Sequence, residues 1–305
     1  MISVSHSLRS KLLVVGGDSL IGRGLVEHYR KQGVAVCYTS RRPNNKTDCI
    51  YLELGKAFDL PNIPDVAILC AGVTDFRTCA EQPDATRRIN VDAMLELAAT
   101  LYFRGSRILY LSSNAVCEIE HQGIQSASLP PITTEYGAQK FDAERGILAF
   151  GERAAVVRAT KIVSCKLPLF SDWLRHLGNH VEIRPLSEKY FCPISMLFMV
   201  TWLAELASRN VSGVFHLSGA CLVSYTEFAL HLASSMSADY RLVVPTTIHG
   251  LGIPHVSYLR HACLDMNATT ATVGATAQSV QSVIKDLLEE FSMEQTSARI
   301  EKVNC

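Results

Sequence analysis

Short apolar runs alternate with stretches of helical spacing through the first half of this chain. The runs lie at residues 11–15, 34–38, 50–54, 66–72 and 107–113. Continuous apolar runs of this length are typical of strands buried on both faces of a parallel sheet. Strands that alternate with helices in this way predict an α/β fold with a doubly wound parallel sheet.

The first run leads directly into Gly16-Gly17-Asp18-Ser19-Leu20-Ile21-Gly22, after which apolar residues follow at helical spacing. In a strand-turn-helix of this kind, Gly16 permits the tight bend and Gly22 lets the helix pack closely on the strand. The N-terminus of that helix then faces a pyrophosphate. Ser19 stands where a three-glycine fingerprint has its middle glycine, although a serine can still approach phosphate. The turn predicts a dinucleotide site.

The second run ends in Thr39-Ser40-Arg41-Arg42. No acidic residue stands where one would bind the ribose 2′-hydroxyl of NAD, and two arginines favour a 2′-phosphate. We therefore expect NADP rather than NAD, the alternative being that Arg41 and Arg42 belong to a solvated loop.

A tyrosine and a lysine lie one helical turn apart in Tyr136-Gly137-Ala138-Gln139-Lys140, so both point to one face if the segment is helical. A cation beside a phenol is expected to lower the phenol's pKa from about 10, which makes it a usable general acid or base. Ser112-Ser113 ends the apolar run at 107–113 and would deliver a hydroxyl at the carboxyl edge of the sheet, where ligands bind.

Composition excludes several classes of function. With 305 residues, of which 48% are hydrophobic, the chain can bury a large core. Lys plus Arg equal Asp plus Glu at 29 each, so binding to nucleic acid or to an anionic membrane is not indicated. Residues 1–10 do not resemble a signal peptide, and the apolar segment 194–207 is too short to span a bilayer. Ten cysteines without a C-x-x-C pair suit a reducing compartment, so we expect a cytoplasmic protein.

Metal binding and serine-dependent hydrolysis have little support in the sequence. His176 and His180 lie four residues apart, but no glutamate or cysteine pair accompanies them, and no metal site is predicted. A G-x-S-x-G elbow for hydrolysis is absent from the sequence. Four arginines could bind a substrate diphosphate: Arg175, Arg184, Arg241 and Arg260. Arg260 is the first of these to test.

The composition changes after Arg158, which predicts a second domain. We expect a dinucleotide-binding domain at residues 1–163, to which a later strand near 213–218 returns. Residues 164–291 would form a smaller substrate-binding lobe, with helices at 167–177, 198–207 and 278–291. Residues 292–305 are expected to be a polar tail.

Several of these segments together resemble the extended short-chain dehydrogenase/reductases, also known as the NAD-dependent epimerase/dehydratase family. The resemblance rests on the glycine turn, Cys70-Ala71-Gly72, Asn90, Ser112-Ser113 and Tyr136 to Lys140. Val73-Thr74-Asp75, with Glu81, Pro83 and Leu264-Asp265, resembles the branch that contains dTDP-4-dehydrorhamnose reductase. The chain departs from that pattern at Ser19, at Cys117 and at residues 159–162.

The resemblance implies a role for each residue of the site. Ser113 would hydrogen-bond the substrate carbonyl, Tyr136 would pass the proton, and Lys140 would lower the pKa of Tyr136 and hold the nicotinamide ribose. The turn, the loops and the resemblance together give these cofactor-binding residues: Gly16, Asp18, Ser19, Leu20, Ile21, Gly22, Ser40, Arg41, Arg42, Leu54, Cys70, Ala71, Gly72, Asn90, Tyr136 and Lys140.

Three functions compete. The first is an NADP-dependent reductase or epimerase of a nucleotide-linked keto sugar that works by hydride transfer. The second is a non-catalytic regulator, because the regulatory subunit of methionine adenosyltransferase also resembles this branch. The third is a reductase of a non-sugar carbonyl. The substrate is expected to be a small molecule, and a homodimer is left open.

Overall fold

The computed structural model describes residues 12–42, 45–60, 63–117, 132, 134–247 and 263–303. Its main sheet has seven strands in the order β10-β6-β5-β4-β1-β2-β3. The strands are β1 (Leu12–Val15), β2 (Cys37–Ser40), β3 (Cys49–Tyr51), β4 (Val66–Leu69), β5 (Arg107–Ser113), β6 (Ala154–Ala159) and β10 (Gly213–Leu217).

The sheet confirms the doubly wound α/β fold. β1 pairs in parallel with both β2 and β4, and the next pairings outward, β2 with β3 and β4 with β5, are also parallel. The chain builds outward from β1 to β3 on one side and from β4 to β6 on the other. The strand order therefore reverses between β1 and β4, and such a switch point is where ligands bind in open α/β sheets.

The second strand begins later than expected. The sequence predicted a strand over 34–38, whereas β2 starts at Cys37. The reason lies in the end of α1 (Leu20–Lys31), where Val34 N donates to the Tyr29 carbonyl oxygen at 2.9 Å and Gly33 takes a positive φ of 70°. These residues close the helix and so do not enter the sheet.

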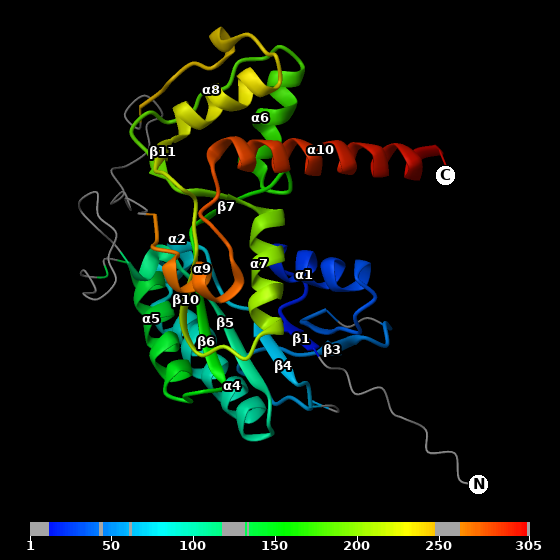
Figure 1. Ribbon diagram of the computed structural model, residues 1–305, viewed down its shortest axis with the longest axis vertical. Helices are drawn as coiled ribbons and strands as arrows, with labels where there is room; N and C mark the ends of the chain where they lie inside the picture. The colour runs from blue at the N-terminus through cyan, green and yellow to red at the C-terminus, as the bar shows by residue number, and fades with distance from the viewer. Residues whose placement is uncertain are drawn as a thin grey trace. The chain divides into compact units, whose positions relative to one another are not determined.

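The helices after β4 begin with α2 (Phe76–Glu81). The helical stretch that follows α2 consists of α3 (Pro83–Arg87), the π-helical segment η1 (Arg88–Ala93) and α4 (Met94–Phe103). A short 3-10 turn, η2 (Asn114–Val116), follows β5, and α5 (Glu135–Leu148) carries Tyr136 and Lys140. Because α4 and α5 share one apolar core with β1, β4 and β5, they cover the same face of the sheet, and α1 lies across the other (Figure 1).

The chain divides into two compact units. The first unit comprises Met1–Ser113, Thr133–Arg158 and Leu203–Phe215, and the second comprises Asn114–Ile132, Ala159–Trp202 and His216–Cys305. The predicted lobe at 164–291 therefore included a segment, residues 203–215, that belongs largely with the sheet. Arg107 of β5 holds that segment by donating to the carbonyl oxygens of Ala207 and Arg209.

The second unit contains β7 (Lys161–Val163), α6 (Pro168–Gly178), β8 (Tyr190–Phe191), β9 (Pro193–Ser195), the start of α7 (Met196–Ser208), β11 (Val223–Ser224), α8 (Tyr225–Ser235), η3 (Tyr240–Leu242), α9 (Asn267–Val273) and α10 (Val280–Val303). Phe170 and Trp173 of α6, Phe228 of α8 and Ile284 of α10 share its buried core.

The segment predicted as a polar tail is helical, because α10 continues through it to Val303 (Figure 1). The segment from Met293 to Lys302 is rich in Glu, Gln, Ala, Met and Lys, which are strong helix formers, so propagation of an existing helix needs no apolar stripe there. No helix within the described ranges combines the length and the apolar character needed to cross a bilayer.

Candidate functional site

The glycine turn after β1 is fastened to the ends of two neighbouring strands. Gly16 N donates to Thr39 Oγ1 at 2.9 Å, and Gly17 N donates to the Thr39 carbonyl oxygen at 2.9 Å. Gly16 has a φ of +88°, and a Cβ placed there would lie 2.9 Å from the Cα of Ala71. Only glycine combines that conformation with so close an approach to the end of β4.

Ser19 caps the helix that follows this turn. Its Oγ accepts from Gly22 N at 3.0 Å and donates to the Gly16 carbonyl oxygen at 2.7 Å. A Cβ at Gly22 would meet that same carbonyl oxygen at 2.2 Å, so the helix sits tightly on the turn. The amides of Leu20 and Ile21 belong to the first turn of α1, where amides have no acceptor within the helix. Such an N-terminus favours an anion.

A cavity of about 410 Å³ opens at this switch point. Its lining includes nine of the residues predicted to bind a cofactor: Gly16, Asp18, Ser19, Ser40, Arg41, Arg42, Leu54, Ala71 and Gly72. It also includes five residues that were not predicted to bind the cofactor: Thr39, Leu52, Glu53, Val73 and Ile89. The other predicted residues do not line this cavity: Leu20, Ile21, Gly22, Cys70, Asn90, Tyr136 and Lys140.

Both arginines that follow β2 are exposed and line the cavity. Neither forms an ion pair with any residue that the structure describes. Glu53, the acid beside Arg41, pairs with Lys56 at 2.9 Å. Asp18 accepts from Ser40 Oγ at 2.5 Å, which ties the glycine turn to the end of β2. The rim of the cavity thus presents two guanidinium groups that can receive an anion.

The predicted catalytic side chains lie close together in the first unit. Ser113, at the last position of β5, hydrogen-bonds the phenol of Tyr136 in the first turn of α5. Lys140 follows one turn later, and its Nζ donates to the Leu111 carbonyl oxygen at 3.0 Å and lies 4.6 Å from the Tyr110 ring centroid. The Phe76 ring packs on Tyr136, with the centroids 4.9 Å apart. Tyr136 and Lys140 are both buried, at 6% and 5% exposed.

The pKa of Tyr136 differs from the sequence-based expectation. Burial raises that pKa above the usual value of a phenol, and the hydrogen bond from Ser113 opposes the rise. Burial also lowers the pKa of Lys140 to about 8. The expected lowering by Lys140 is not seen because its ammonium is bonded to Leu111 on the strand. The raised pKa keeps Tyr136 a protonated phenol at neutral pH and makes it a weaker acid than a phenol in water.

Gln139 is not among the residues predicted from the sequence, and it joins the two parts of the site. Its Oε1 accepts from Asn90 Nδ2 at 2.8 Å, and its Nε2 donates to Thr86 Oγ1 at 2.9 Å. Asn90 in turn accepts from Val73 N at 2.7 Å and donates to the Val73 carbonyl oxygen at 2.9 Å. The network links α5, next to Lys140, to the loop that lines the cavity. No spacing rule predicts it, because its members come from segments distant in sequence.

Three of the four arginines proposed to clamp a diphosphate are in ion pairs. Arg175 pairs with Asp172, Arg184 with Glu182 at 2.6 Å and Arg241 with Asp239 at 2.6 Å. All three pairs are between nearby residues on the surface, so they satisfy these cations locally. Arg260 lies outside the described residues.

The chain resembles proteins of more than one kind in sequence. It is 23% identical over 297 residues to a probable low-salt glycan biosynthesis reductase, Agl14, of Haloferax volcanii, which covers 92% of this chain and 97% of the relative. It is 24% identical over 260 residues to the methionine adenosyltransferase 2 subunit beta of Xenopus laevis, covering 79% of this chain and 77% of the relative.

Solved structures share the fold. A dTDP-4-dehydrorhamnose reductase of Bacillus anthracis, in complex with NADP, has a TM-score of 0.76 at 18% identity and covers 93% of this chain and 100% of that one. MoeE5 in complex with UDP-glucose and NAD has a TM-score of 0.75 at 20% identity, covering 93% and 99%. Residues 10–293 match the family described as RmlD substrate binding domain. The chain belongs to the RmlD substrate binding domain family.

Proposed function

We propose that this protein is an NADP-dependent oxidoreductase that reduces or epimerises a nucleotide-linked keto sugar by hydride transfer. The observation that carries the proposal is the hydrogen bond between Ser113 and Tyr136, with Lys140 one helical turn further along α5. A hydroxyl, a protonated phenol and an ammonium held together are the groups that a carbonyl reduction needs from a protein.

The first unit fits a dinucleotide cofactor. The cavity lies at the switch point of the sheet, Gly16 lets the backbone approach closely, and the first-turn amides of α1 favour a diphosphate. Arg41 and Arg42 would hold a 2′-phosphate because neither is paired with an acid of the described chain. Ala71, Gly72 and Val73 would flank the cofactor beyond its diphosphate.

Proton transfer falls to the chain's own residues. The nicotinamide ring, when bound, gives or accepts the hydride. Ser113 would turn its hydroxyl proton from Tyr136 to the substrate carbonyl oxygen and hydrogen-bond it. Tyr136 would then give its proton to that oxygen as negative charge develops on it. The buried cation of Lys140 would stabilise the phenolate that remains, because charges interact more strongly away from water.

A nucleotide-linked sugar is the substrate that the relatives favour. The reductase of Bacillus anthracis is named for dTDP-4-dehydrorhamnose, and MoeE5 was solved with UDP-glucose. Relatives at this identity support a class of substrate rather than a particular sugar. A reductase of a non-sugar carbonyl would use the same three catalytic side chains.

A non-catalytic regulator is the second candidate. Methionine adenosyltransferase 2 subunit beta proteins of several vertebrates, including Xenopus laevis and Pongo abelii, are similar to about four fifths of this chain. A regulatory subunit could use the same cavity to bind a nucleotide. It would have no need of a phenol and a lysine at the carboxyl edge of β5.

The test is NADPH oxidation measured with a panel of nucleotide-linked keto sugars and small ketones. The Tyr136→Phe variant should keep its NADPH affinity and lose about 10² to 10⁴-fold in kcat, because only the proton donor is removed. Tyr110→Phe is the matched control, since the Tyr110 hydroxyl is buried and has no hydrogen-bond partner among the residues that the structure describes, and it should keep full activity.

The outcome of this assay distinguishes the three candidate functions. Turnover of a nucleotide sugar that depends on Tyr136 supports the proposal, and turnover of small ketones alone supports the non-sugar reductase. Tight NADPH binding without turnover on any carbonyl would sink the enzyme proposal in favour of the regulator.

A further inference from the structure

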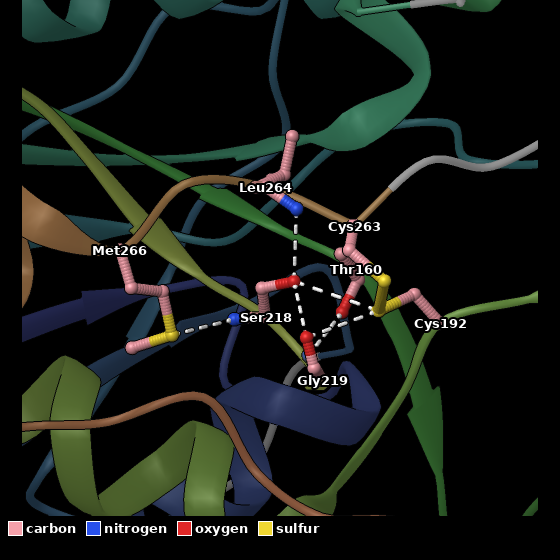
Figure 2. The surroundings of a disulfide bond; sticks show 7 residues. All are labelled: Thr160, Cys192, Ser218, Gly219, Cys263, Leu264 and Met266. Carbon is pink, nitrogen blue, oxygen red and sulfur yellow. Dashed lines mark hydrogen bonds between the residues drawn. A yellow bond between two sulfur atoms is a disulfide. The ribbon is translucent and has the colours of Figure 1, made fainter. Parts of the chain in front are cut away.

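One disulfide lies in the second unit, between Cys192 and Cys263 (Figure 2). Cys192 connects β8 to β9, and Cys263 lies four positions before the start of α9. Their Cα atoms are 5.5 Å apart, a normal separation for a disulfide, although 71 positions separate them in sequence. Seven further cysteines of the described residues lie outside this disulfide: Cys37, Cys49, Cys70, Cys79, Cys117, Cys165 and Cys221.

This disulfide lies in a chain with seven further described cysteines, so a thiol of the same chain is available to exchange with it. Where thiols are kept reduced, a disulfide is usually transient, redox-sensing or catalytic. The question is then how a reductant could reach this disulfide.

The two sulfur atoms differ in their surroundings. Cys192 is fully buried, and its Sγ lies 3.2 Å from the Gly219 carbonyl oxygen and 3.5 Å from Ser218 Oγ (Figure 2). Cys263 is only half-buried. An incoming thiolate therefore reaches the sulfur of Cys263, and Cys192 is the leaving group, whose thiol could donate to the Gly219 carbonyl oxygen.

The segment around Cys263 does not depend on the disulfide for its place. Leu264 N donates to Ser218 Oγ at 2.9 Å, and Ser218 N donates to Met266 Sδ at 3.3 Å (Figure 2). These bonds would keep Cys263 close to Cys192 after the disulfide opens. Closing it again would then require little movement of the chain.

A third cysteine, Cys221, lies near this disulfide. Cys221 is exposed and follows, by two residues, the Gly219 carbonyl that contacts Cys192. Two residues span at most about 7 Å of extended chain, so the thiol lies near the disulfide. Burial and the nearby carboxylate of Glu227 raise the pKa of the Cys221 thiol.

We propose that Cys192, Cys221 and Cys263 form a thiol–disulfide exchange site that reacts with a small-molecule thiol of the glutathione class. The Cys221 thiolate attacks Sγ of Cys263, a Cys221–Cys263 bond forms, and the bond to Cys192 breaks. The electron pair goes to Sγ of Cys192, which takes a proton from water, so this step involves no net oxidation. Two external thiols then reduce the exposed disulfide and leave as their own disulfide.

The test follows the disulfide of the full-length protein in glutathione buffers. Samples are trapped with N-ethylmaleimide at intervals, digested, and the linked peptides are quantified by mass spectrometry. Cys221→Ser should slow the opening of the Cys192–Cys263 disulfide by reduced glutathione by about tenfold or more, because the external thiol must then attack a hindered bond. Cys49→Ser, which removes a half-buried thiol of the first unit, should open at the wild-type rate.

A second variant gives an independent measurement. With Cys192→Ser, glutathione disulfide should produce a Cys221–Cys263 bond inside the chain. The proposal is overturned if Cys221→Ser opens as fast as wild type, or if Cys192→Ser yields only glutathione adducts. It is equally overturned if wild type equilibrated with glutathione disulfide forms no Cys192–Cys263 bond. None of these measurements depends on turnover, so they test the exchange site independently of the proposed oxidoreductase activity.

Discussion

Lys140 is the residue whose surroundings differ most from what its spacing suggests. It lies one turn from Tyr136 on α5, yet its ammonium bonds the Leu111 carbonyl oxygen and sits over the Tyr110 ring. Burial disfavours the charged form of a lysine, which is why its pKa falls to about 8. A buried cation of this kind stabilises negative charge at the site at the expense of the fold's stability.

That cost predicts a pH-dependent stability. The unfolded pKa of lysine, 10.5, exceeds the folded value of about 8, so between these values the unfolded chain binds a proton that the folded chain does not. The contribution of Lys140 to the free energy of unfolding therefore rises with pH between these two values, by up to about 3 kcal/mol. The difference in unfolding free energy between wild type and Lys140→Met should grow in favour of wild type from pH 8 to pH 10.5.

Denaturant unfolding at several pH values measures this difference. Lys285→Met is the control, because its side chain is 75% exposed, and its difference from wild type should stay constant with pH. A Lys140→Met difference that is flat with pH would show that the lysine is not held in the buried position.

At the residue scale, Arg41 and Arg42 lead us to predict which cofactor the protein prefers. Wild type should bind NADPH at least about tenfold more tightly than NADH, or about 1.4 kcal/mol, because two guanidinium groups without acidic partners can receive a 2′-phosphate. Changing both to Ala should remove the preference and leave NADH affinity nearly unchanged. Fluorescence titration with each cofactor measures it, and equal affinities in wild type would contradict the assignment.

At the scale of elements, the turn that joins β1 to α1 fixes the geometry of the cofactor cavity. Ser19 caps the helix, Thr39 fastens the turn, and Gly22 packs against the Gly16 carbonyl. The helix axis is thereby fixed relative to the cavity. On the other face of the sheet, Glu144 of α5 and Arg158 of β6 form a buried bidentate ion pair, which holds the helix that carries Tyr136 and Lys140.

Gly22→Val should abolish NADPH binding. A Cβ at Gly22 meets backbone, the Gly16 carbonyl oxygen at 2.2 Å, so the helix must move away from the turn and take its first-turn amides with it. Gly178→Val near the end of α6 is the matched control, because the nearest atom there is the terminal methyl of Met236 at 3.8 Å. Circular dichroism must show that both variants fold. A folded Gly22→Val protein with normal NADPH affinity would refute the role given to this turn.

Over the whole molecule, the two compact units should respond to different signals. NADPH is expected to bind residues of the first unit, and the disulfide lies in the second. Hydrogen exchange with mass spectrometry should show that NADPH protects peptides from residues 12–31, where ligand binding stabilises the native state. A reductant should increase exchange in peptides that cover 190–195 and 263–273 and leave residues 12–31 unchanged. Changes in residues 12–31 on reduction would contradict this separation.

The sequence by itself determined the doubly wound sheet, the glycine turn and the positions of Ser113, Tyr136 and Lys140. These features are local: an apolar run, a turn and a helical spacing each follow from residues within about one or two turns of one another. The same locality explains two errors. Val34 closes α1 through a bond to Tyr29 instead of starting β2, and good helix formers carry α10 through the predicted tail.

Only the tertiary structure decided which residues meet across the sheet. Thr39 reaches Gly16 from the neighbouring strand, Gln139 joins Asn90 from 49 positions away, and Cys192 pairs with Cys263 across 71 positions. It also decided the direction of the pKa shift at Tyr136, because burial outweighs a cation that is bonded elsewhere. Such contacts depend on how separate segments pack and on how much water they exclude, and neither is written in the spacing of residues along one segment.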